Sequence, residues 1–149
     1  MRSGVRVALD LGTRRIGVAR CDREAIMAVP DRTIDAGDPT WLAQVTALVR
    51  EHGAMELIVG NPVSLRGRAE SASQSARERA TLLAHVLGEL PVRMVDERLT
   101  TAGAMRQLQA SGKNSKQARQ FIDAQAAVGI LEFALEYERR TGQPAGELL

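Results

Sequence analysis

The segment VRVALDLGTRRIGVARC, residues 5–21, determines how the fold begins. It contains two runs of apolar and β-branched residues, separated by a polar, glycine-containing stretch at residues 11–15. Apolar runs bounded by turn residues are typical of strands, and two such runs joined by a short turn predict a hairpin. We therefore expect the chain to start with two antiparallel strands, with Asp10 at the end of the first.

The rest of the sequence extends this hairpin into a mixed sheet. The further elements that we expect, in chain order, are a third strand from Ile26, a helix from Asp38-Pro39 to His52, a strand at 56–60, a helix ending at Gly88, a strand at 92–96, a short helix at 102–109 and a last helix from about residue 114 to Arg140. Strands that follow a helical crossover pair in parallel. The prediction is a mixed five-stranded sheet, three antiparallel strands then two parallel ones, flanked by helices in one α/β domain.

Length and composition limit the classes of protein that the chain can represent. The chain has 149 residues, which suits a single domain over 1–149, and we expect a loose tail from about residue 143. Its only cysteine, Cys21, excludes an intrachain disulfide and suits a reducing compartment. No apolar run is long enough for a membrane span, and the start has no signal-peptide pattern, so we expect a cytoplasmic protein without membrane contact.

Basic residues are concentrated in the middle of the chain. Between Asn61 and Arg119 there are ten basic and five acidic residues, and nearly all the basic residues of the chain are arginine. Such a segment is compatible with phosphate binding, although a solvated surface rich in arginine has the same composition. Aromatic residues make up only 3% of the chain, so a nucleic-acid surface would depend on phosphate contacts more than on base stacking.

Three acidic residues occupy positions where apolar residues are expected. Asp10 ends an apolar strand, and Glu97 directly follows another. Asp123 lies at helical spacing from Ala126 and Ile130, which places its side chain toward the sheet. A buried carboxylate is costly unless it has a cationic partner, and three at the ends of neighbouring elements favour a divalent metal with oxygen ligands, Mg²⁺ or Mn²⁺.

The alternative explanation for these acids is local ion pairing. The candidate pairs are Asp10 with Arg14 or Arg15, Glu97 with Arg98, and Asp123 with Arg119. For each acid alone, ion pairing is the commoner explanation. The metal hypothesis requires the three acids to converge in space, which the sequence does not prove.

The motifs around the three acids resemble those of the YqgF/RuvX family. LDLGTRRIGVA at 9–19 is similar to the opening motif of the family, DERLTT at 96–101 matches its signature in full, and DAQAA at 123–127 matches its late motif. VGNP at 59–62 resembles the central loop, but Asn61 stands where leucine is usual. The resemblance covers nearly the whole chain and implies a ribonuclease H-like nuclease of the bacterial cytoplasm, with Asp10, Glu97 and Asp123 as catalytic, metal-binding acids.

This family is described both as maturing the 5′ end of pre-16S rRNA and as resolving Holliday junctions, so the resemblance leaves pre-rRNA and branched DNA open as substrates. Cleavage of a four-way junction would suit a two-fold homodimer, which the sequence does not reveal. A remote alternative is an actin-like nucleotide-binding domain, because Asp10-Leu11-Gly12-Thr13 also resembles the phosphate loop of those proteins. The residues that we expect to contact substrate are Arg14, Arg15, Arg66, Arg68, Arg98, Lys113 and Lys116.

Overall fold

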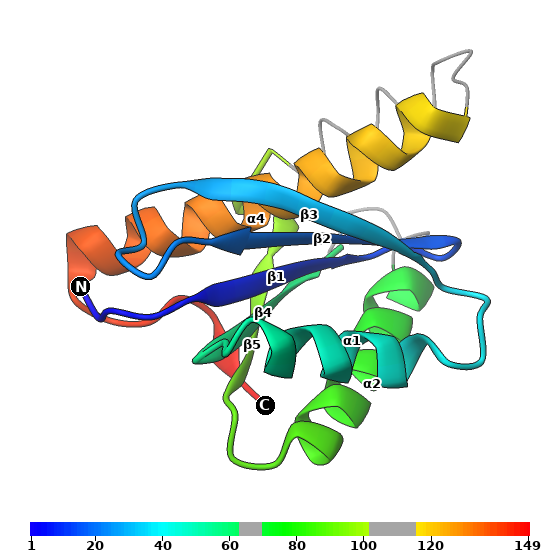
Figure 1. Cartoon of the computed structure of the whole chain (residues 1–149), viewed down its shortest axis with the longest axis horizontal. Coiled ribbons are helices and arrows are strands. Elements are labelled where there is room, and N and C mark those ends of the chain that lie inside the picture. Colours follow the sequence, from blue (N-terminus) through cyan, green and yellow to red (C-terminus); the bar gives the residue numbers. More distant parts are fainter. Residues whose placement is uncertain (63–69, 102–115) are drawn as a thin grey trace.

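A six-stranded mixed sheet forms the centre of the computed structural model, which describes residues 1–62, 70–101 and 116–149 (Figure 1). The strands follow the order β3-β2-β1-β4-β5-β6 across the sheet. Their bounds are β1 Arg6–Leu11, β2 Arg15–Cys21, β3 Ala28–Asp35, β4 Glu56–Asn61, β5 Val92–Asp96 and β6 Glu147–Leu148. Strands β1, β2 and β3 are antiparallel neighbours, whereas β4 pairs in parallel with both β1 and β5. The expected order of three antiparallel strands followed by two parallel ones is confirmed.

The C-terminal segment differs from the expectation. Residues 147–148 form the sixth strand, antiparallel to β5, and the amide of Leu149 donates to the carbonyl of Val92 at 2.9 Å. Ala145 is buried, and Leu149 packs against the core. The prediction of a loose tail from about residue 143 was therefore wrong, because these apolar side chains and the free edge of β5 bind the segment. The sheet accordingly has six strands rather than five.

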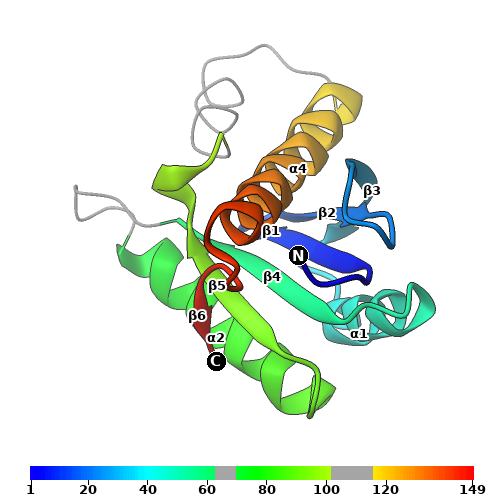
Figure 2. The ribbon, with the colours of Figure 1, turned by 90° about the vertical axis from the view of Figure 1, so that its left-hand side faces the viewer.

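Helices cover both faces of the sheet (Figure 2). Helix α4, Lys116–Thr141, covers one face, while α1, Trp41–Glu51, and α2, Glu70–Leu87, cover the other. Helix α1 begins later than Asp38-Pro39 predicted, because the Asp38 carboxylate accepts hydrogen bonds from the Thr40 amide and hydroxyl in the preceding turn. The helix expected at 102–109 lies outside the described residues. In the ranges that the structure describes, none of the helices has the length and apolar character needed to cross a membrane.

Side-chain alternation along β1 divides the core into two layers. Val7, Leu9 and Leu11 point to the α1/α2 face, where they pack with residues of both helices. Ala8 points to the α4 face and packs with Ala127 and its neighbours. The alternation therefore places the Asp10 side chain on the α4 face, at the carboxyl end of the strand.

Buried charges at the opposite end of the sheet are paired with one another. The Arg6 guanidinium, in a residue only 1% exposed, donates to Glu138 at the end of α4 at 2.7 Å. Arg2 also binds Glu138, and it contacts Glu56 at 3.1 Å. Arg93 donates to the same Glu56 oxygen at 3.1 Å. These contacts join the N-terminal segment, β4, β5 and the C-terminal part of α4.

Acid should destabilise the protein through Glu138. Burial raises the pKa of its carboxyl, but hydrogen bonds from Arg2 and the charge of Arg6 outweigh burial, so the net pKa in the folded protein lies below its ordinary value. A lowered folded-state pKa adds stability above the unfolded-state pKa, and that stability is lost as the pH falls through the folded-state pKa. Urea unfolding between pH 7 and pH 3 should therefore show a loss of free energy of unfolding that is smaller in Glu138→Gln. An equal loss in both proteins would contradict this assignment.

Candidate active site

Asp10 lies in a gap in the side-chain layer of the sheet. It is 2% exposed, and its neighbours across the sheet are Gly17 on β2 and Gly60 on β4. Residues directly opposite each other on neighbouring strands point to the same face. Because both neighbours are glycines, no side chain flanks the Asp10 carboxylate on either adjacent strand, and other elements approach the sheet there.

Helix α4 fills the space over Gly17. A Cβ atom on Gly17 would lie 2.0 Å from the backbone oxygen of Asp123, so the helix backbone lies directly on β2. The small residues Ala124, Ala126 and Ala127 on the inner side of the helix permit this approach. Asp123 is itself only 7% exposed, which confirms the prediction that it points toward the sheet.

Glu97 fills the space over Gly60. A Cβ atom on Gly60 would lie 2.9 Å from Glu97 Oε1 and 2.4 Å from Ile130 Cδ1 of α4. Glu97 is 3% exposed and begins a 3₁₀ turn, η2, Glu97–Leu99, directly after β5. All three predicted acids are therefore buried on the α4 face, around the carboxyl end of β1.

The residues after Glu97 hold this turn in place. Both the amide and the hydroxyl of Thr100 donate to the Glu97 carbonyl at 2.9 Å, and the Asp96 carboxylate accepts from the Arg98 amide at 2.9 Å. Thr101 Oγ1 lies against Gly129 of α4, at a point where a Cβ atom would be 2.2 Å away. The DERLTT segment thus fixes the backbone of Glu97 through hydrogen bonds from Thr100, and Thr101 packs the turn against α4.

The ion pairs differ from those that sequence neighbours suggested. Arg98 pairs with Asp96, Nη2 to Oδ2 at 2.6 Å, rather than with Glu97, and hydrogen bonding from Arg98 lowers the pKa of Asp96. The Asp123 carboxylate accepts a hydrogen bond from Arg15 Nε, a residue 108 positions away. The side chain of Arg119, the partner considered from sequence, is outside the described part. Arg15 therefore belongs to the site as the counter-charge of one of its acids.

The three acids supply the donor chemistry of a hard divalent cation. They offer only carboxylate oxygens, and Cys21 lies at the other end of β2, where its Sγ accepts from the Arg6 amide. In this arrangement, and over residues 1–62, 70–101 and 116–149, no three acidic, histidine or cysteine side chains lie close enough together to hold a metal ion. The acids share one face and one end of the sheet, and Arg15 occupies one carboxylate oxygen of Asp123, Oδ2.

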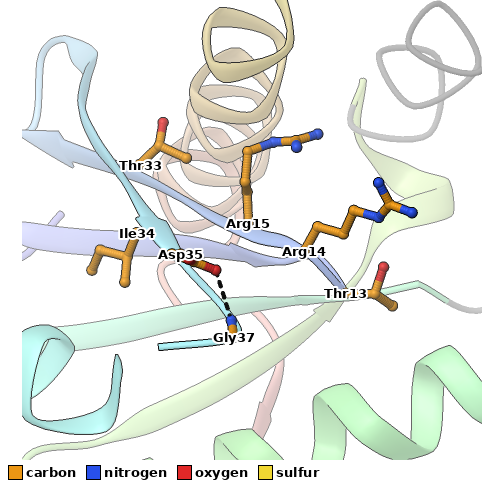
Figure 3. Close-up of a pocket in the computed structure, with 7 residues that line it drawn as sticks. All are labelled: Thr13, Arg14, Arg15, Thr33, Ile34, Asp35 and Gly37. Atoms are coloured by element: carbon orange, nitrogen blue, oxygen red, sulfur yellow. Dashed lines mark hydrogen bonds between the residues drawn. The ribbon is translucent and has the colours of Figure 1, made fainter. Parts of the chain in front are cut away.

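A polar pocket lies beside Arg15, the residue that donates to Asp123 (Figure 3). It is lined by Thr13, Arg14 and Arg15 from the β1–β2 turn and by residues 33–35 and 37 from the end of β3. The Asp35 carboxylate accepts from the Gly37 amide at 2.8 Å, while the Arg14 side chain is exposed. Both guanidinium groups line this pocket, and that of Arg15 also contacts the buried Asp123.

Other residues expected to contact substrate fall outside the described ranges. Arg66, Arg68 and Lys113 lie in undescribed segments, and the side chain of Lys116, at the start of α4, is likewise not described. Two features were missed by sequence reasoning. Arg79 of α2 donates to the backbone just after Asp10, and Phe121, expected on a helix packed against the sheet, is 64% exposed. The outward helical position of Phe121, two residues before Asp123, could have revealed its exposure.

Comparisons with known proteins identify the family that the chain resembles over most of its length. A family model described as "RuvX: Holliday junction resolvase" matches residues 4–137. A protein of Streptomyces coelicolor named "Putative pre-16S rRNA nuclease" is 45% identical over 99% of this chain and 89% of its own length. One of Thermobifida fusca with the same name is 46% identical over 100% and 98%.

The solved structures show the same fold. Thermus thermophilus RuvC in complex with a Holliday junction substrate superposes with a TM-score of 0.61 at 14% identity, over 98% of this chain and 99% of that one. The expected ribonuclease H-like fold is thereby confirmed. At this identity, the similarity supports the fold alone.

Adding a methyl group at Gly17 should separate α4 from the sheet. In Gly17→Ala the new Cβ would meet backbone rather than a movable side chain, so we expect the free energy of unfolding to fall by about 1–3 kcal/mol, as in other overpacked cores. The displacement of Asp123 should also abolish activity. Gly37→Ala is the control, because its nearest contact is the exposed Asp35 side chain at 3.3 Å. Wild-type stability of Gly17→Ala in urea unfolding would contradict the close approach.

Proposed function

The chain belongs to the RuvX (Holliday junction resolvase) family, and we propose that it is a metal-dependent nuclease that hydrolyses phosphodiester bonds in structured RNA, maturing the 5′ end of pre-16S rRNA in the cytoplasm. The relatives that are similar over nearly the whole chain bear the name of this activity. All three proposed catalytic acids lie in the part of the chain that the structure describes. We take residues 1–149 as a single nuclease domain.

One observation supports the proposal above the others. Asp10 lies between two glycines, with the backbone of Asp123 against one and the carboxyl group of Glu97 against the other. The core around them is apolar, and gathering like charges in such a core opposes folding. We take these three acids, of which Asp123 is paired with Arg15, as the groups that would bind the cation.

Asp10, Glu97 and Asp123 would hold Mg²⁺ or Mn²⁺, and ions bound there would activate water and stabilise the leaving oxygen in phosphodiester hydrolysis. The protein supplies the rigid placement of the acids and the exclusion of bulk water, since each acid is less than a tenth exposed. The amide and hydroxyl of Thr100 hold Glu97 by its carbonyl, which fixes the backbone that bears the carboxylate.

The two arginines of the β1–β2 turn have different parts in this proposal. Arg15 neutralises Asp123, and its guanidinium would also be placed to contact a substrate phosphate. Arg14 is exposed at the polar pocket between the β1–β2 turn and the end of β3. In this proposal it contacts the nucleic-acid backbone next to the cleaved bond. Arg66, Arg68, Lys113 and Lys116 extend the phosphate contacts, while Arg98 contacts substrate only after leaving Asp96.

Cleavage of four-way DNA junctions is the second candidate function, and the description of the family favours it. Such an enzyme would act as a homodimer, with one active site for each of two symmetric strands. The actin-like alternative loses its support, because the family match extends over the segments of all three acids.

Cleavage assays on a precursor rRNA fragment and on a four-way DNA junction, each with Mg²⁺, Mn²⁺ or chelator, test the proposal. We expect metal-dependent cleavage that favours the rRNA fragment, and its loss in Glu97→Gln. Mg²⁺ should raise the melting temperature of the wild type more than that of Glu97→Gln, because binding to the folded state stabilises it. Glu89→Gln, which changes an exposed acid, serves as the control. Cleavage by Glu97→Gln at the wild-type rate would refute the assignment, and preference for the junction would select the second function.

Nucleic-acid affinity should depend strongly on salt. If arginine and lysine contacts to phosphates dominate, log affinity falls linearly with log salt, with a slope of about −0.9 per neutralised phosphate on duplex DNA and about −0.7 on single strands. Replacing Arg66 and Arg68 together by Gln should make the slope shallower by about one unit for each phosphate that is no longer neutralised, equally for all sequences of one shape. Arg140→Gln should leave the slope unchanged, because Arg140 pairs with Glu136 at the far end of α4. Salt-insensitive, sequence-selective binding would indicate base readout instead.

A further inference from the structure

Arg79 of α2 contacts the strand end that bears Asp10 from the opposite face of the sheet. Its Nη2 donates to the Leu11 carbonyl at 2.7 Å, and its Nη1 donates to the Gly12 carbonyl at 2.9 Å. These are the two residues directly after Asp10. The Asp10 side chain points to the α4 face, whereas α2 lies on the other face, so Arg79 holds the catalytic strand from behind.

The turn that Arg79 holds is tightly closed. The Gly12 amide donates to the Asp10 carbonyl at 3.0 Å, and a Cβ atom on Gly12 would lie 2.4 Å from the Arg15 carbonyl oxygen. A guanidinium is planar and donates in fixed directions, so two charge-assisted bonds from one group fix both the position and the orientation of the backbone. Any shift of this turn displaces Asp10 on one side and Arg15 on the other.

The same helix contacts the end of the neighbouring strand. The Ser73 hydroxyl donates to Asn61 Oδ1 at 2.6 Å, and Asn61 is the last residue of β4. Asn61 directly follows Gly60, the residue against which Glu97 packs. Ser73 and Arg79 are about 9 Å apart along the helix axis. Helix α2 therefore holds the ends of both central strands, and Asn61, where the family usually has leucine, takes part in one of these contacts.

The helix has an apolar attachment that does not need Arg79. Ala76, Ala80 and Leu83 of α2 are fully buried in the core between the helices and the sheet. These side chains attach the helix to the sheet independently of the two bonds from Arg79 to the turn after Asp10.

We propose that Arg79 is a positioning residue of the nuclease, which sets the place of Asp10 relative to Glu97 and Asp123 without contacting metal or substrate. The inference rests on the proposed function, since it assumes that the three acids bind a divalent cation. It predicts a change in cation affinity that has the opposite sign from simple electrostatics. Removing a positive charge near a cation site should strengthen cation binding, whereas loss of positioning should weaken it.

The test compares Arg79→Met and Arg79→Lys with Arg77→Met. Arg77 lies on the same helix and pairs at 2.8 Å with the exposed Glu147, so its replacement removes the same charge without touching the turn. Mn²⁺ titration by calorimetry, without nucleic acid, measures cation affinity. Thermal unfolding of the metal-free proteins measures stability, and steady-state cleavage of the preferred substrate separates kcat from KM.

In Arg79→Met we expect Mn²⁺ affinity and kcat to fall roughly 10–100-fold, as on loss of other groups that orient metal ligands, with KM changed less than kcat. Arg79→Lys should recover part of both, because an ammonium can still donate to one of the carbonyls. Arg77→Met should match the wild type or bind Mn²⁺ slightly more tightly. If Arg79→Met does not fold, partial loss of Mn²⁺ affinity in Arg79→Lys decides in favour of the proposal.

Unchanged or tighter Mn²⁺ binding by folded Arg79→Met or Arg79→Lys, beside a wild type that binds Mn²⁺, would overturn the positioning role alone. A wild type that does not bind Mn²⁺ would overturn the proposed function, and the positioning role with it. The wild-type titration therefore distinguishes the two failures.

Discussion

The backbone contact between α4 and β2 at Gly17 is the constraint on which the site depends. Because Gly17 has no side chain, the backbone of α4 packs directly on β2. This contact places Asp123 against the residue that pairs with Asp10 across the sheet. The same closeness brings Ile130 over Gly60, and Gly129 against Thr101 of the turn that bears Glu97. A single axial position of α4 thus satisfies three contacts with three different elements, which explains why small residues occur along its inner side.

The two ends of the sheet use buried charge in different ways. At one end, Arg6 and Arg2 neutralise Glu138 with short hydrogen bonds and join both terminal parts of the chain. At the other end, three acids surround one strand end, with Arg15 as the counter-charge of Asp123. Removing one partner at the first end would leave a buried charge uncompensated, and removing Arg15 would do the same to Asp123 at the second. The three acids thus lie at the opposite end of the sheet from the network that holds the termini.

Sequence patterns were sufficient to locate the strands and the buried face of α4, because both follow from local periodicity. Apolar runs located the strands at 92–96 and 56–60 closely, and helical spacing placed Asp123 on the inner face of α4. The partners of the charged residues could not be read in this way. Arg15 binds a residue 108 positions away and Arg79 contacts the backbone 67 positions away, and such pairs arise only from tertiary packing. Arg98 does pair locally, but with Asp96 rather than with the adjacent Glu97 that sequence reasoning considered.

Strand β6 closes the edge of the sheet that β5 would otherwise expose. It pairs with Arg93 and Met94, while the other edge strand, β3, contains Pro30, which has no amide proton to offer a neighbouring chain. Open edges with unpaired backbone groups are templates for aggregation and for sheet-to-sheet association. Loss of the last few residues would expose the edge of β5, and its unpaired backbone groups would then be free to pair with a strand of another chain.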